Sequence, residues 1–141
     1  MKKKWFVLVV AVMLVMVGCG SKPTLAEWVE SDDIVDAENL TNEELAASGL
    51  GIRAKYSADG EDILVISYIF DQYQQLNGLD QNEINTAYAE ELNNMGTSRN
   101  LSAIFVGCEE NTGITLKCIR VQFVNADGTV IYSQEYLDTK E

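Results

Sequence analysis

The hydrophobic positions follow different spacings in different parts of the chain. Residues 5–17 are continuously apolar, whereas apolar positions beyond Thr24 recur either every three to four residues or every second residue. Thr24 and Glu27 have the spacing of a helical capping box, and the three-to-four spacing continues up to Gly49. This pattern predicts a helical segment that begins at Thr24 and stops at Gly49. A second capping-box pattern favours a break near Leu40.

Two pairs of strands are predicted from alternation with a period of two. The first pair comprises residues 52–56 and 63–70, which are separated by a polar turn at residues 57–61. The strand at 63–70 is apolar on both faces, which indicates a central position in a sheet. The second pair comprises residues 114–124 and 129–137, joined by the sequence NADG, whose Asp-Gly step is a strong hairpin signal.

A long helix is expected between the two hairpins. Its apolar residues recur every three to four positions from Asp80 to Cys108, residues 96–98 weaken its middle, and residues 111–113 end it. The order helix, hairpin, long helix, hairpin predicts an α+β fold in which a four-stranded antiparallel sheet carries helices on one face. A chain of 141 residues favours one domain, which we expect at residues 24–141.

The N-terminal segment has the composition of a secretory signal peptide. Lys2–Lys4 give it a positive start, and an apolar run of thirteen residues, Trp5–Val17, follows. That run is shorter than the about 20 residues that a membrane-spanning helix needs. We therefore expect the segment to be removed from the mature protein.

The end of this segment resembles the lipobox of bacterial lipoproteins. In that motif a cysteine thiol receives diacylglycerol, and the peptide is cleaved just before the cysteine. The matching residues are Met16, Val17, Gly18 and Cys19. We expect residues 1–18 to be a lipoprotein signal peptide, Cys19 to be the lipid-attachment site and residues 19–23 to form a short tether. The alternative is an ordinary cleaved signal with an incidental cysteine.

Composition restricts the partners and the chemistry. The chain has 22 acidic and 10 basic residues, so its net charge is −12, and it contains no histidine. Acidity of this degree argues against nucleic-acid binding. The absence of histidine excludes Ser-His-Asp and Cys-His nucleophilic sites and imidazole-containing zinc sites. The acidic clusters at 32–36 and 59–62 fit a helix start and a turn better than a calcium loop. We expect no metal, no cofactor and no catalytic residue that the sequence identifies.

Cys108 and Cys118 are the remaining cysteines. Outside the cytoplasm two thiols often pair, and a helix end followed by a strand is a reasonable geometry for a disulfide. The alternative is two buried thiols that act as small apolar residues. A catalytic cysteine is disfavoured because no histidine is present to act as its base.

Two stretches of the mature chain resemble a known group of proteins. The sequences TLAEWVES, after the tether, and VQFVNADGTVIYSQEY, near the end, are similar to those of small lipoproteins of Gram-positive, Firmicutes-type bacteria that carry a single C-terminal domain of unknown function. The resemblance implies a lipid-tethered, extracytoplasmic α+β domain on the outer face of the membrane. It implies no catalytic residues.

The sequence favours a non-enzymatic binding module whose partner is another surface protein or a cell-wall ligand. One alternative is a lipoprotein that binds a small cationic or apolar solute, although such proteins generally have two lobes. Another is a cell-wall hydrolase built from two carboxylates, which would require an acidic pair in a groove.

Overall fold

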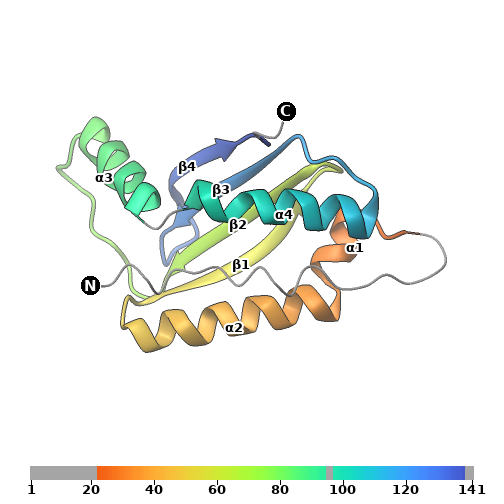
Figure 1. The fold of residues 1–141 in the computed structure, drawn as a ribbon. Helices are drawn as coiled ribbons and strands as arrows, with labels where there is room; N and C mark the ends of the chain where they lie inside the picture. Colours follow the sequence, from red (N-terminus) through yellow and green to blue (C-terminus); the bar gives the residue numbers. More distant parts are fainter. Residues whose placement is uncertain (1–21, 95–96, 139–141) are drawn as a thin grey trace.

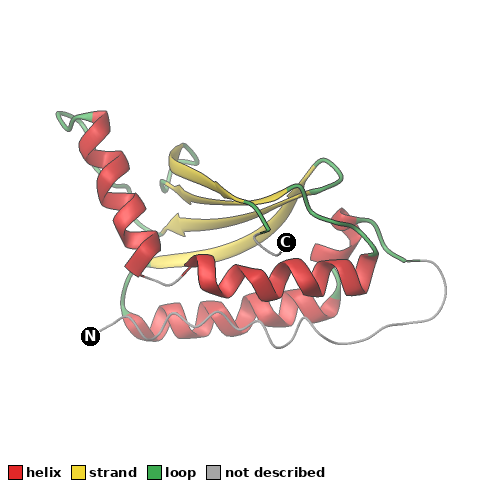
Figure 2. Cartoon of the chain, turned by 45° about the horizontal axis from the view of Figure 1, so that its top comes forward, coloured by secondary structure: helices red, strands yellow, loops and turns green. Residues whose placement is uncertain are grey.

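The computed structural model describes residues 22–94 and 97–138, and only the backbone of residues 98–99. The chain forms a four-stranded sheet with helices packed against one face (Figures 1 and 2). The α+β class and the position of the helices agree with the sequence pattern. Within the described residues, no helix is long and apolar enough to cross a membrane.

The N-terminal helical segment is divided into two helices, α1 (Leu25–Val29) and α2 (Asp32–Ser48). The predicted capping box is confirmed, because the Thr24 hydroxyl accepts from the Glu27 amide at 3.1 Å and the Glu27 carboxylate accepts from the Thr24 amide at 3.0 Å. The predicted break near Leu40 is wrong. α2 continues through it because the buried Thr41 hydroxyl donates to the Ala37 carbonyl instead of capping a new helix.

Both predicted hairpins are present. β1 (Ile52–Asp59) pairs antiparallel with β2 (Ile63–Phe70), and β3 (Cys118–Val124) pairs antiparallel with β4 (Val130–Tyr136). Alternate residues of the first three strands face the helices and form the core. They are Ile52, Ala54 and Tyr56, Leu64, Ile66 and Tyr68, and Ile119, Val121 and Phe123.

The prediction of an entirely antiparallel sheet is wrong, because β2 and β3 pair in parallel within the strand order β1-β2-β3-β4. The connection between them explains the difference. The chain leaves β2 at one end of the sheet and returns through helices to the other end before β3 begins (Figure 1). A helical crossover of this kind joins parallel strands.

The predicted long helix is divided into α3 (Gln81–Asn94) and α4 (Thr97–Thr112). The division falls where the sequence pattern weakens. α4 lies along the sheet beside α2, whereas α3 projects from the end of the sheet (Figures 1 and 2).

Candidate functional site

A pocket of about 310 Å³ lies between α3 and one end of the sheet. Its walls come from the loop before β1, the ends of β1, β2 and β3 that meet there, and one face of α3. We call it the α3 pocket. Its lining residues are Leu50, Ile52, Phe70, Ala87, Tyr88, Glu91 and Phe123.

Three aromatic rings form one side of the α3 pocket. The ring centroids of Tyr88 and Phe123 are 4.8 Å apart, and those of Phe70 and Phe123 are 6.2 Å apart. Phe70 and Tyr88 meet edge to face at 6.4 Å. These separations fall within the range at which aromatic pairs attract, so the rings hold one another in place.

The loop between α2 and β1 supplies the aliphatic side of the pocket. Gly49 ends α2 with φ 76°, and Gly51 has φ 71°, which are conformations that residues with a Cβ rarely adopt. Leu50 lies between these glycines and is 42% exposed at the pocket mouth. The Gly51 carbonyl accepts from the Asp71 amide at 2.9 Å, which ties this loop to the end of β2.

Asn125 fixes the segment that leads to α3. Its side chain is buried at the end of β3, where its Oδ1 accepts from the Gln74 amide at 2.7 Å and its Nδ2 donates to the Gln74 carbonyl at 3.0 Å. The same Oδ1 accepts from the Ala126 amide at 2.8 Å. The sequence pattern predicts only a hairpin turn at this residue. Its position just before a turn gives no signal for a contact with a residue 51 positions away.

Glu91 supplies the one charged group among the residues that line the pocket. Burial, followed by the negative charge of Glu91, raises the pKa of the Tyr88 hydroxyl. Among the side chains that the structure describes, no basic group forms an ion pair with Glu91. The pocket therefore combines an apolar wall with a carboxylate that pairs with none of the described basic side chains.

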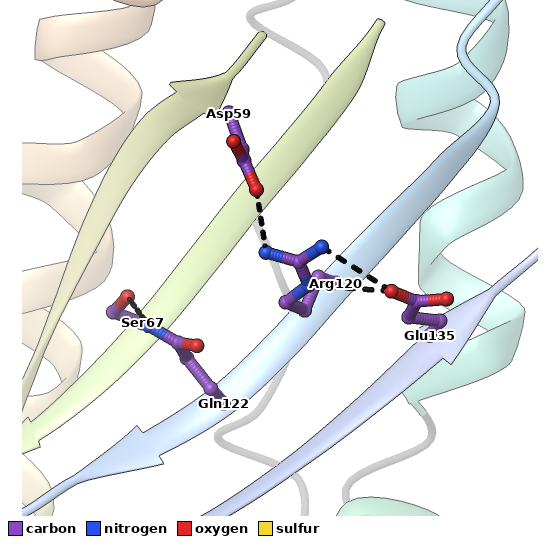
Figure 3. Close-up of polar contacts among 5 residues, drawn as sticks. All are labelled: Asp59, Ser67, Arg120, Gln122 and Glu135. Carbon is purple, nitrogen blue, oxygen red and sulfur yellow. Dashed lines mark hydrogen bonds and ion pairs between the residues drawn. The ribbon is translucent and has the colours of Figure 1, made fainter. Parts of the chain in front are cut away.

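The sheet face opposite the helices carries a polar network (Figure 3). The Arg120 guanidinium on β3 donates to Asp59 of β1 at 2.8 Å and to Glu135 of β4 at 3.3 Å. Its neighbour Gln122 donates to the Ser67 hydroxyl of β2 at 3.0 Å. The arginine links the two outer strands across this face, and its charge is already compensated.

The two candidate disulfide cysteines are free and buried. Cys108 lies on α4 and belongs to the core between the helices and the sheet. Cys118 alternates with Ile119, which faces that core, so the Cys118 side chain lies on the opposite face of the sheet. The structure does not bring the two thiols together. Burial raises the pKa of both thiols, as expected for unreactive cysteines.

The lipobox residues Met16, Val17, Gly18 and Cys19 lie outside the described residues. The described chain begins at Lys22, whose Nζ donates to the Glu110 carbonyl at 3.5 Å near the end of α4. Within the described part of the chain, no group of three or more His, Cys, Asp or Glu side chains is arranged to hold a metal ion.

Comparison with known proteins assigns the chain to one family. The model of the "Domain of unknown function (DUF4854)" family matches residues 25–136, so the chain belongs to this family. The match covers most of the chain and agrees with a single domain. No curated protein and no solved structure matches the chain.

Proposed function

We propose that the chain is a lipid-anchored, extracytoplasmic binding domain of a Gram-positive lipoprotein, and that it acts by binding rather than by catalysis. The lipobox pattern and the apolar leader that precedes it support lipid attachment at Cys19. The observation that carries the binding role is the α3 pocket, in which three aromatic rings and only one titratable carboxylate line the wall. Small-molecule sites are typically concave and mostly apolar, with few polar groups.

Lys22, the first described residue after the proposed anchor, and the α3 pocket lie at opposite ends of the domain. Lys22, three residues after Cys19, contacts the end of α4 near the start of β3, whereas the pocket lies at the far ends of β2 and β3. Strands of seven to eight residues span about 25 Å. An anchored domain whose strands run perpendicular to the membrane would therefore hold the pocket away from the membrane, where a surface protein or a solute can reach it.

A small solute is the second candidate occupant. The volume of the α3 pocket, about 310 Å³, supports this role because it lies at the lower end of the range for small-molecule sites, about 300–1,000 Å³. A hydrolase that uses two carboxylates gains no such support. That mechanism needs an acidic pair, and Glu91 is the single carboxylate in the pocket lining.

The binding role is tested with a neutral apolar probe, 4-phenyl-1-butanol. The full-length protein in phosphatidylcholine nanodiscs is labelled with ¹³C at isoleucine and alanine methyl groups, and the Ile52 and Ala87 signals are followed by NMR. We expect saturable shifts of both signals, and we expect Ala87→Trp to abolish the Ile52 shift by filling the pocket. Ala26→Trp, an exposed position on α1 at the other end of the domain, is the matched control. No saturable shift in the parent protein would refute a binding role for this pocket.

A further inference from the structure

We propose that the α3 pocket selects a small organic cation with an apolar body. The inference rests on the proposed binding role and adds the chemical class of the ligand. Its basis is the combination of aromatic rings and a carboxylate at one site, together with the negative charge of the surrounding segment.

The aromatic side of the pocket suits a cation as well as an apolar group. The faces of Phe70, Tyr88 and Phe123 carry partial negative charge, and cations are attracted to such faces within about 6 Å of the ring centroid. The rings are held at 4.8–6.4 Å from one another, so they need little rearrangement to receive a ligand. Aliphatic Leu50 and Ile52 line the same pocket and would contact the apolar body of the ligand.

Glu91 gives the pocket its charge preference. It lines the same pocket as Phe70, Tyr88 and Phe123, and its negative charge contributes to the raised pKa of the partly buried Tyr88 hydroxyl. No described basic side chain neutralises it. An ammonium group at the pocket edge would be attracted to Glu91, whereas a carboxylate or phosphate there would be repelled.

The segment around the α3 pocket is also negatively charged. Residues 71–94, which comprise the loop before α3 and the helix itself, contain five acidic residues and no lysine or arginine. The acidic residues are Asp71, Asp80, Glu83, Glu90 and Glu91. Like charges around a concave site raise the local concentration of the oppositely charged ligand and disfavour anions.

Three probes of the same length separate charge from shape. 4-Phenylbutylamine is a cation at neutral pH, 4-phenyl-1-butanol is neutral and 4-phenylbutyrate is an anion. Each is titrated into full-length protein in phosphatidylcholine nanodiscs, and the dissociation constant is measured from the Ile52 and Ala87 methyl signals. We expect the amine to bind about fivefold more tightly than the alcohol, and the butyrate to bind more weakly than both.

Two variants test whether Glu91 is the source of the preference. Glu91→Gln should reduce the advantage of the amine over the alcohol from about fivefold to less than twofold. Glu90→Gln removes the same charge from a neighbouring position that does not line the pocket, and should retain most of the advantage. In 0.5 M salt the advantage of the amine should also decrease in the parent protein.

The outcomes distinguish the two proposals. Equal binding of the three probes, or tighter binding of the butyrate, would overturn the cation preference and leave the binding role intact. An equal loss in both glutamine variants would show that general acidity, and not Glu91, sets the preference, and would overturn the assignment to this residue. If none of the probes binds, both proposals fail.

Discussion

Asn125 shows how a single side chain can position the candidate site. Its amide group bonds both the amide and the carbonyl of Gln74, and this pairing holds the loop before α3 against the end of β3. Asn125→Ala should lower the free energy of unfolding by about 1–3 kcal/mol, because the Gln74 amide, the Gln74 carbonyl and the Ala126 amide lose this partner. Urea unfolding measures this loss, and Asn77→Ala, in the exposed part of the same loop, is the control.

Asn125→Asp refines this prediction. The carboxylate can still accept from the Gln74 amide but cannot donate to the Gln74 carbonyl. This variant should therefore be destabilised less than Asn125→Ala. Wild-type stability in both variants would show that the loop is held by other contacts.

Because of Tyr56, the free energy of unfolding should depend on pH in the alkaline range. Its ring is buried beneath α2, and burial raises the pKa of its hydroxyl to about 12 from the ordinary value of 10.0. The folded protein thus holds this proton more tightly than the unfolded chain. The contribution is fully present below pH 10 and is lost as the pH rises from 10 through 12, by about 3 kcal/mol at most.

Unfolding in urea at pH 8, 10 and 11 measures this dependence. The free energy of unfolding should fall as the pH rises, and Tyr56→Phe should make the fall shallower. Burial raises the pKa of Tyr68 as well, so the variant should reduce the fall without removing it. Tyr73→Phe changes an exposed ring and serves as the control. An identical pH dependence in Tyr56→Phe and the parent would contradict the prediction.

At the scale of elements, helix α2 protects the edge of the sheet. Asn42 donates to the Ala54 carbonyl at 3.0 Å and accepts from the Ala54 amide at 2.6 Å, as a neighbouring strand would. Glu38 accepts from the next amide on that edge, that of Tyr56, at 2.7 Å. These side chains form hydrogen bonds with backbone groups of β1 that would otherwise be available for pairing with another chain.

Removal of this protection should be measurable. Asn42→Ala should lower the free energy of unfolding by about 1–2 kcal/mol and increase the hydrogen-exchange rate of the Ala54 amide, because that amide loses its acceptor. Asn39→Ala lies on the exposed side of the same helix and should change neither quantity. Unchanged exchange at Ala54 in Asn42→Ala would mean that the side chain does not protect the edge.

The elements also show which features a sequence can predict. The capping box at Thr24, the stop at Gly49 and the Asp-Gly hairpin depend on neighbouring residues, and each was predicted correctly. The parallel pairing of β2 and β3 depends on where a 47-residue connection between Phe70 and Cys118 returns the chain, which no local pattern records. The α3 pocket has the same origin, because its lining residues come from positions 50 to 123. Within the sequence, Glu91 is one of 22 acidic residues and has no distinguishing motif.

At the scale of the whole molecule, the described domain has two unlike ends. The end of α4 lies at one end and the acidic α3 at the other (Figure 1). Lys22 contacts the end of α4, and the pocket lies beside α3. Lipid attachment at Cys19 would orient the domain relative to the membrane, because the four residues after the cysteine reach at most about 14 Å. The domain would then sit close to the bilayer with the end near Lys22 facing it.

Substitution of the proposed anchor tests this arrangement. Cys19→Ala removes the thiol that would carry diacylglycerol, so the protein should either be released from the membrane or remain as an uncleaved precursor. Fractionation of cells, with labelled palmitate to detect acylation, measures both results. Ser21→Ala changes a nearby residue of the tether without removing a thiol and should leave the protein acylated and membrane-bound. A Cys19→Ala protein that is mature in size and still bound to the membrane would show that another feature holds it there, and the orientation of the α3 pocket away from the bilayer would lose its basis.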